Sequence, residues 1–114
     1  MITLYGIPNC DTVKKARTWL DAHRVAYDFH DFKKLGIEKS VLESWVKRLG
    51  WETVINRAGT TFRKLPDAQK ANLTEGKAIA LMIAQTSIIK RPVLVGAGQV
   101  MVGFKPDLYE KLLG

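Results

Sequence analysis

The sequence predicts one α/β domain over residues 1–114, ordered as βαβ, a helical insert at about 37–88, and ββα, around a small mixed four-stranded sheet. Three observations support this order. Strand, helix and strand patterns follow one another before residue 31, residues 37–88 show helical spacings, and two short apolar runs separated by Gly96-Ala97-Gly98 precede a last helix pattern. A hydrophobic content of 46% in 114 residues allows one compact core, so we expect no second domain.

The first part of the order is a strand, a helix and a second strand. Residues 2–5 form an apolar run, and a helix pattern then extends to about residue 22 with apolar positions at Val13, Ala16 and Leu20. An alternating segment follows, with apolar residues at Val25, Tyr27 and Phe29. A crossover helix makes the two strands parallel and the connection right-handed. Because open α/β sheets bind ligands at the carboxyl ends of their strands, we expect a site at the end of the first strand.

The predicted insert consists of helices joined by irregular chain. Its first helix starts near Ile37 and ends at Gly50, a residue type common at helix C-termini, and its apolar positions are Val41, Leu42, Trp45, Val46 and Leu49. Residues 54–59 are expected to be irregular, and a short helix follows over about 60–65. Thr74 is expected to cap a longer helix whose apolar residues are Ile79, Met82 and Ile83. We interpret the tryptophans and the methionine of this helix as core residues.

The last part of the chain predicts a hairpin and a helix. Residues 88–95 form a loop that leads into a buried strand, and residues 99–103 form the strand paired with it. The final helix begins at Lys105-Pro106, because proline is favoured at the first helical position. The leucines expected to pack inward from this helix are Leu108, Leu112 and Leu113.

The charge of the chain favours anionic partners. Lysine and arginine number 18 against 11 aspartate and glutamate, which gives a net charge of +7. The basic residues occur as scattered short pairs, without a long basic tract or an aromatic-rich RNA-binding signature, so the sequence argues against direct nucleic-acid binding. The alternative interpretation is an ordinary solvated basic surface.

The sequence gives no sign of membrane insertion or export. The longest apolar stretch, residues 78–84, is too short to span a bilayer, and no basic leader precedes the first strand. We therefore expect a cytoplasmic protein with no membrane partner.

The lone cysteine, Cys10, is the leading candidate for a catalytic residue. It follows Gly6-Ile7-Pro8-Asn9 at the junction of the first strand and helix, where backbone N–H groups and the helix dipole stabilise a thiolate. Lys14 and Lys15 follow within a turn and act in the same direction, whereas the adjacent Asp11 acts against it. We therefore expect a lowered pKa and a reactive nucleophile. The alternative is a small buried apolar residue.

A single thiol restricts the chemistry. It allows neither an internal disulfide nor a cysteine-rich metal site, and His23 and His30 lack metal-ligand spacing, so no metal is expected. A thiolate that attacks a disulfide or an oxidised centre becomes covalently trapped, and its release needs a second thiol. Val13 stands where a Cys-x-x-Cys protein has its resolving cysteine, so turnover must use an external thiol. The abundant cytosolic thiol, glutathione, is the expected reducing co-substrate, and no bound cofactor is expected.

Three segments carry a resemblance to a known family. They are residues 5–16 (YGIPNCDTVKKA), the segment from Asn56-Arg57 to Arg63-Lys64-Leu65, and residues 89–93 (IKRPV). Together they resemble the arsenate reductase-related (ArsC-like) family, and the first segment most resembles the branch of the YffB-type proteins and the Spx-type transcription regulators. The resemblance extends over essentially the whole chain, insert included. It implies a thioredoxin-like fold in which Pro92 is a cis-proline beside the active thiol.

The resemblance also assigns roles to individual residues. In the glutathione-dependent arsenate reductases of this family a cysteine attacks arsenate and arginines flank the oxyanion. Cys10 matches the nucleophile, and Arg57 and Arg91 match two of the arginines. The third falls at Lys105, which keeps the charge but lacks the planar donors that suit an oxyanion. The histidine that precedes the family's cysteine is replaced at Gly6. Both differences weaken the case for arsenate as the substrate.

Each of these cations also has a plainer interpretation. Arg57 and Arg91 can be surface charges, since most arginine side chains are exposed. Lys105 stands at the predicted cap of the last helix, where serine, aspartate or asparagine is preferred, and a locally unfavourable residue can mark function. Asn9 and Lys14, on either side of the cysteine, are expected to support the site.

Two classes of function follow. The first is a glutathione-dependent thiol reductase that acts on a small oxyanion or a disulfide, with glutaredoxin as a further partner and weak arsenate reduction as a variant. The second is a regulatory protein that binds RNA polymerase, as Spx-type proteins do. Val13 removes the Cys-x-x-Cys redox switch of those regulators but not their capacity for binding. The two classes differ in whether Cys10 is needed.

Overall fold

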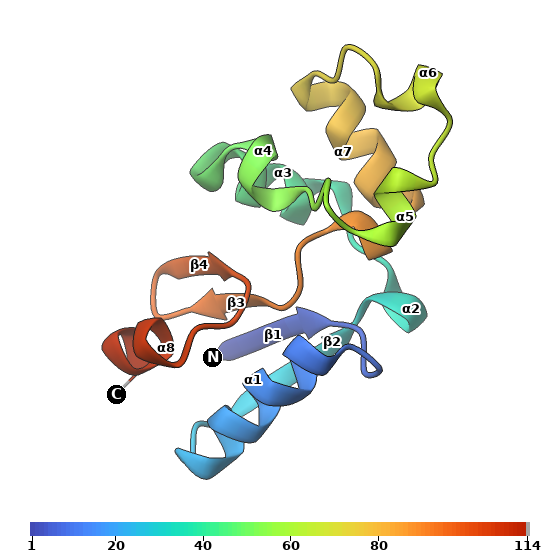
Figure 1. The fold of residues 1–114 in the computed structure, drawn as a ribbon. Helices are drawn as coiled ribbons and strands as arrows, with labels where there is room; N and C mark the ends of the chain where they lie inside the picture. The colour runs from blue at the N-terminus through green and yellow to red at the C-terminus, as the bar shows by residue number, and fades with distance from the viewer. Residues whose placement is uncertain (114) are drawn as a thin grey trace. The chain divides into compact units, whose positions relative to one another are not determined.

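The structure is a computed structural model, and it describes residues 1–113. Its chain divides into two compact units, Met1–Leu35 with Arg91–Gly114, and Gly36–Lys90. The elements of both units are drawn in Figure 1. The first unit contains all four strands, and the second unit is helical.

The first unit is built on a mixed four-stranded sheet. Its elements are β1 (Ile2–Gly6), α1 (Asp11–Ala22), β2 (Tyr27–Asp31), α2 (Phe32–Leu35), β3 (Val93–Gly96), β4 (Gln99–Val102) and α8 (Pro106–Leu113). The strand order is β2-β1-β3-β4, in which β1 and β2 are parallel and the other two pairs are antiparallel. This arrangement confirms the sheet expected from the sequence.

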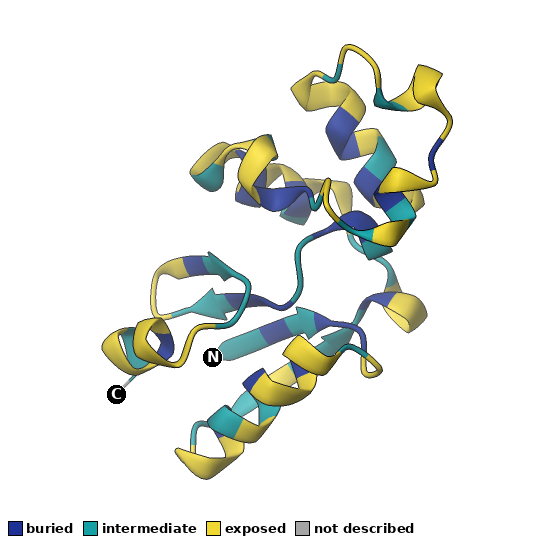
Figure 2. Cartoon of the chain, viewed as in Figure 1, coloured by how far each residue is buried: buried dark blue, intermediate teal, exposed yellow. Residues whose placement is uncertain are grey.

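The core of this unit lies on one face of the sheet. Five residues from β1, α1, β3 and α8 form it, and each is 0% exposed: Leu4, Ala16, Leu20, Leu94 and Tyr109. Figure 2 shows the buried stripe of α1 turned to the sheet and its exposed side turned away. Leu4 and Leu94 are register partners, so the apolar side of α1 and Tyr109 of α8 pack on the same pair of strands.

Gly6 allows α1 to approach β1 closely. A Cβ atom at this position would lie 2.8 Å from Cγ2 of Val13, which is fully buried. Any side chain at residue 6 would therefore push the first turn of α1 away from the strand. The glycine sets the distance between the end of β1 and the start of the helix.

The predicted hairpin is confirmed. Gly96 pairs with Gln99, and the two residues between them, Ala97 and Gly98, have φ values of 51° and 75°. Positive φ at both central residues is the geometry that follows the twist of a tight hairpin, and glycine adopts it without steric cost.

The second unit contains the helices of the insert. They are α3 (Lys39–Leu49), α4 (Trp51–Val54), α5 (Thr60–Arg63), α6 (Asp67–Lys70), α7 (Glu75–Ala84) and the 3-10 turn η1 (Thr86–Ile88). α3, α4 and α7 contact one another around buried Leu42, Trp45 and Met82. Two predicted helix ends are confirmed. Gly50 follows α3 and donates its N–H to the Val46 carbonyl at 2.7 Å, and the Thr74 hydroxyl accepts from the Lys77 N–H at 3.3 Å.

Some sequence predictions differ from the structure. The one-turn helices α2, α4 and α6 were not expected, because four residues are too few to show a helical period. β2 begins at Tyr27 rather than Val25, because the Val25 N–H still bonds to Leu20 at the end of α1. The inward position expected for Leu108 is wrong. It is 45% exposed, and Tyr109 occupies the buried side of α8 instead.

One further core assignment is too broad. Of the tryptophans only Trp45 is fully buried, while Trp19 and Trp51 are half-buried. Ile83 of α7 is 37% exposed. None of the helices within residues 1–113 has the length and apolar character that a membrane span requires.

Candidate active site at the start of helix α1

Cys10 stands between the end of β1 and the first residue of α1. Its N–H donates to the Ile7 carbonyl at 3.1 Å, and its own carbonyl accepts from the Lys14 N–H at 2.9 Å. The backbone therefore turns tightly after the strand and enters the helix at the cysteine. The residue is half-buried, so the thiol is held by the fold and still meets solvent.

The pKa of the Cys10 thiol is lowered from its usual value. Burial acts to raise it, but hydrogen bonds from the Val13 N–H, the Arg91 side chain and the Thr12 N–H favour the thiolate, and the charge of Arg91 adds to them. The direction agrees with the expectation from the helix terminus. The groups responsible are only partly those expected, because Lys14 and Lys15 are exposed and are not among them.

Arg91, whose side chain donates a hydrogen bond to the Cys10 thiol, begins the second of the two chain segments that make up the first unit. It precedes β3, whose first residue, Val93, pairs with Tyr5 of β1. This register brings the segment before β3 to the carboxyl end of β1, next to the cysteine. The Arg91–Pro92 peptide bond is cis, and Pro92 is buried. The structure thus brings together Cys10 and Arg91, which the sequence separates widely, and Pro92 directly follows Arg91.

The other predicted site residues have different surroundings. Lys105 directly precedes α8 and is exposed, and its carbonyl accepts from the N–H groups of Leu108 and Tyr109 at 3.1 Å each. It is not among the groups that shift the pKa of Cys10. Asn9 and Lys14 are exposed on either side of the cysteine.

Arg57 belongs to the second unit and has local partners there. Its Nη2 lies 3.8 Å from Oε2 of Glu52, and its guanidinium lies 5.6 Å from the ring centre of Trp51. The Arg57 side chain is 50% exposed, so the ion pair with Glu52 contributes little to stability. The preceding residue, Asn56, accepts the Ala58 N–H at 3.2 Å and shapes the loop that carries the arginine.

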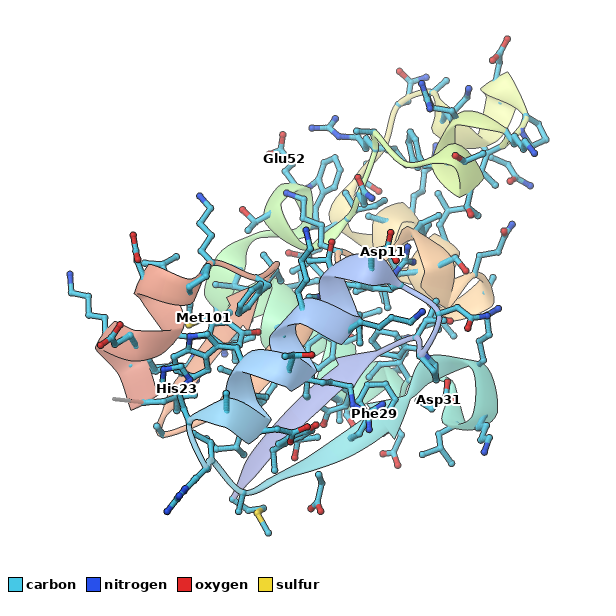
Figure 3. The ribbon with its side chains drawn as sticks, turned by 60° about the horizontal axis from the view of Figure 1, so that its bottom comes forward. Asp11, His23, Phe29, Asp31, Glu52 and Met101 are labelled. Atoms are coloured by element: carbon cyan, nitrogen blue, oxygen red, sulfur yellow. The ribbon has the colours of Figure 1, made fainter. Side chains whose placement is uncertain are left out.

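Sequence reasoning did not identify an aromatic cluster at the carboxyl ends of β1 and β2. The ring centres of Tyr5 and His30 lie 4.7 Å apart, and that of Phe32 lies 6.1 Å from Tyr5 and 5.9 Å from His30. The alternation at Val25, Tyr27 and Phe29 includes neither His30 nor Phe32, so no sequence pattern signals this cluster. The labelled Asp31 in Figure 3 marks this end of β2.

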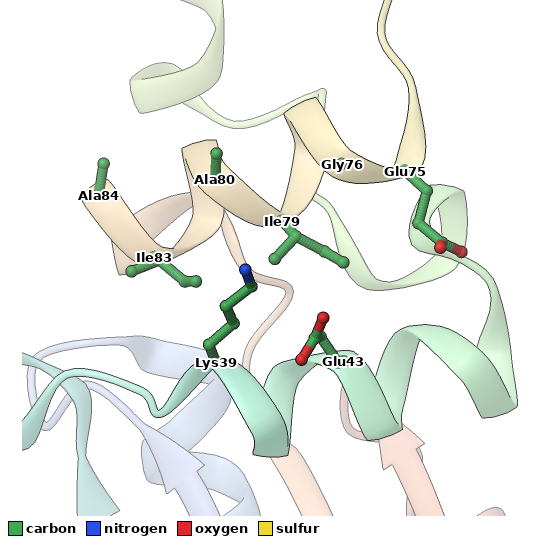
Figure 4. Close-up of a pocket in the computed structure, with 8 residues that line it drawn as sticks. All are labelled: Lys39, Glu43, Glu75, Gly76, Ile79, Ala80, Ile83 and Ala84. Carbon is green, nitrogen blue, oxygen red and sulfur yellow. The ribbon is translucent and has the colours of Figure 1, made fainter.

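Each unit also has a hollow on its surface. In the first unit a hollow of about 410 Å³ lies between α1 and the start of α8, and in the second one of about 470 Å³ lies between α3 and α7. Figure 4 shows the second hollow, with Lys39 and Glu43 of α3 directed towards Ile79 of α7. Cys10 lines neither. Within residues 1–113 no three His, Cys, Asp or Glu side chains are grouped to hold a metal ion.

Comparison with known proteins gives matches over nearly the whole chain. A model of the ArsC family matches residues 5–112. The solved structure of a protein named YffB is 62% identical with a TM-score of 0.97, and the match covers 100% of both chains. An arsenate reductase (ArsC) related protein from Brucella melitensis is 53% identical with a TM-score of 0.77, over 96% of this chain and 92% of that one. The global transcriptional regulator Spx of Streptococcus agalactiae is 28% identical, over 94% of this chain and 79% of Spx.

Proposed function

The chain belongs to the ArsC family and has its thioredoxin-like fold, and from that premise we propose that it is a glutathione-dependent thiol reductase with Cys10 as the nucleophile. One observation carries the proposal. The half-buried thiol has a lowered pKa because two backbone N–H groups and the Arg91 guanidinium favour its thiolate. A thiolate held in this way is both a competent nucleophile at neutral pH and a good leaving group.

The proposed reaction has two steps. In the first, the Cys10 thiolate attacks the glutathione sulfur of a mixed disulfide R–S–S–G, which forms Cys10–S–S–G and releases R–S⁻, protonated by water. In the second, the thiolate of a free glutathione attacks the glutathione sulfur on Cys10, which forms glutathione disulfide and restores the Cys10 thiolate. The net reaction is R–S–S–G + GSH → R–SH + GSSG: the substrate sulfur is reduced, one glutathione is oxidised, and the proton that this glutathione loses balances the one that R–S⁻ takes up.

The surroundings of Cys10 support a release step by an external thiol. Val13 occupies the position that a second cysteine would take in a Cys-x-x-Cys motif. Its side chain is fully buried and packs at Gly6, where it belongs to the contact between α1 and β1. The position serves packing, and glutathione supplies the second thiol.

A disulfide substrate is favoured over arsenate. Arg91 is the one cation of residues 1–113 that shifts the pKa of Cys10, and Lys105 offers a point charge rather than a bidentate donor. A disulfide sulfur needs no such clamp, because no oxyanion forms in the exchange. Arsenate reduction, with glutaredoxin completing the cycle, is the weaker activity in this proposal.

A second candidate is a regulatory protein that binds RNA polymerase. The 28% identity to Spx over 109 residues favours it. In this case Cys10 would be dispensable, because the contact surface need not include the thiol, and Val13 leaves no cysteine pair for a disulfide switch.

Turnover of a small glutathione mixed disulfide separates the candidates. The mixed disulfide of mercaptoethanol and glutathione is supplied with glutathione, and the glutathione disulfide formed is measured through glutathione reductase. We expect turnover by the native protein, one glutathionyl group on Cys10 by mass spectrometry, and loss of both in Cys10→Ser. Normal folding without turnover or adduct would overturn the reductase proposal, and Cys10-independent retention of RNA polymerase subunits would establish the second candidate.

A further inference from the structure

The hollow between α1 and the start of α8 is an apolar groove that follows α1 from Lys14 to His23. We call it the α1–α8 groove, and it is lined mainly by Lys14, Lys15, Thr18, Trp19, His23 and Phe104. Lys14 and Thr18 are four residues apart, which places them on one side of the helix, and the Lys14 N–H donates to the Cys10 carbonyl at 2.9 Å. The groove therefore runs along α1 on the C-terminal side of Cys10, which does not itself line it.

The floor of the groove is aromatic and held in place. Trp19 stacks on His23 with 3.8 Å between ring centres, and His23 Nδ1 lies 2.9 Å from the Trp19 carbonyl oxygen. Trp19 and Phe104 both make edge contacts with the buried Tyr109, at 5.6 Å and 4.8 Å. Figure 3 shows His23 at the end of α1 near α8. Because Tyr109 already holds Trp19 and Phe104 in place, these side chains lose little conformational entropy when a ligand covers them. This favours binding of an apolar side chain.

The end of the groove nearest Cys10 in sequence carries two lysines, and within residues 1–113 no carboxylate forms an ion pair with either. Both of them, Lys14 and Lys15, are exposed. Lys105 precedes Pro106, which closes the groove on the α8 side. The nearest carboxylates in sequence, Asp11, Asp21 and Asp107, are exposed and do not line it. Charge complementarity thus calls for an occupant that is acidic near the thiol and apolar further along.

We propose that the α1–α8 groove binds the polypeptide of a glutathionylated protein substrate, taking acidic residues at Lys14 and Lys15 and an apolar side chain on Trp19 and Phe104. The inference rests on the proposed function, since it names the substrate class of that site. Glutathione alone has carboxylates but nothing to cover the aromatic floor. A nucleic-acid strand needs a basic track along its whole length, and the lysines stand at one end only.

The geometry sets the spacing in the substrate. Thr18 is eight residues after Cys10, which is about 12 Å along the helix. An extended peptide covers about 3.3 Å per residue, so its apolar side chain belongs about four residues from the reacting cysteine, with acidic residues in between.

The test uses three glutathionylated peptides. The first has Glu at the second and third positions and Phe at the fourth position on both sides of its cysteine; in the second Lys replaces Glu, and in the third Ser replaces Phe. The protein is compared with Thr18→Glu, which adds a negative charge in mid-groove, and with Thr18→Gln as the neutral control. Binding of each peptide with Ser in place of its cysteine is measured by ¹⁵N chemical shifts of Cys10→Ser protein.

The first peptide is expected to have a KM about fivefold lower than either other peptide, with kcat unchanged. This is the size of one exposed charge contact for the second peptide and of a partly buried apolar side chain for the third. Thr18→Glu removes this advantage and Thr18→Gln keeps it. Equal KM values for the three peptides, with normal turnover of the small disulfide, would overturn the groove and leave the reductase standing. Shifts at Trp19 and Phe104 without any reduction would support the groove and overturn the reductase. Displacement of the peptide by single-stranded RNA at equal concentration would overturn a peptide site.

Discussion

At the scale of single residues, the chemistry depends on how Cys10 and Arg91 meet. Arg91 does two things to the thiol at once, because it donates a hydrogen bond and contributes a positive charge. The backbone N–H groups of Thr12 and Val13 also favour the thiolate, and they belong to the first turn of α1, far from Arg91 in the sequence. The thiolate is thus favoured by groups from two segments, and a change in one leaves the other in place.

Removal of Arg91 is expected to raise the pKa of Cys10 towards its usual value. Arg91→Ala loses both the hydrogen bond and the charge, so alkylation by iodoacetamide at neutral pH slows severalfold while the rate at high pH is kept. Arg91→Lys keeps the charge, so its alkylation rate at neutral pH is expected to lie between those of the native protein and Arg91→Ala. The pH profile of alkylation measures the effect, with Lys33→Ala as a control on an exposed cation of the same unit. An unchanged profile in Arg91→Ala would make this arginine a surface charge.

At the scale of elements, the sequence predicted what periodicity and turn chemistry encode. The parallel strand pair, the hairpin at Ala97-Gly98, the cap at Thr74 and the helix that begins at Pro106 all carry local signals that the structure confirms. One-turn helices carry too few residues for a period. The rotation of α8 that buries Tyr109 and exposes Leu108 depends on packing against Trp19 and Phe104, which no local pattern contains.

The contact between β1 and α1 can be tested at Gly6. Gly6→Ala places a Cβ against the short, branched and fully buried side chain of Val13, and we expect about 1–3 kcal/mol lower free energy of unfolding together with slower turnover, because the start of α1 carries Cys10. The matched control is Gly76→Ala in α7, where nothing lies within 4 Å of the added atom. There a gain of about 0.5–1 kcal/mol is expected from the better helix former. Urea denaturation of both variants gives the comparison, and a neutral Gly6→Ala would contradict the proposed role of the glycine.

At the scale of the whole molecule, the chain leaves the first unit after Leu35 and returns to it at Arg91. The site therefore draws on both ends of the sequence, and only the pairing of β1 with β3 accounts for the meeting of Cys10 with Arg91. Sequence motifs identified both residues but not this contact, since strand pairing across the insert has no local signal. Arg57 belongs to the other unit, so its predicted role at the anion stays a prediction.

The hydrogen bonds at Cys10 also make the free energy of unfolding depend on pH. Because the pKa of the thiol is lower in the folded protein than in the unfolded chain, the thiolate contributes stability that is fully present above the unfolded pKa and is lost as pH falls through the folded pKa. The difference in free energy of unfolding between the native protein and Cys10→Ser should therefore grow with pH across that window, which denaturant titrations at a series of pH values can measure. A difference in free energy of unfolding that does not change with pH would contradict the lowered pKa of Cys10 in the folded protein. Within the window the chain gives up part of a proton each time it folds, and calorimetry in buffers of different ionisation heat can count that release.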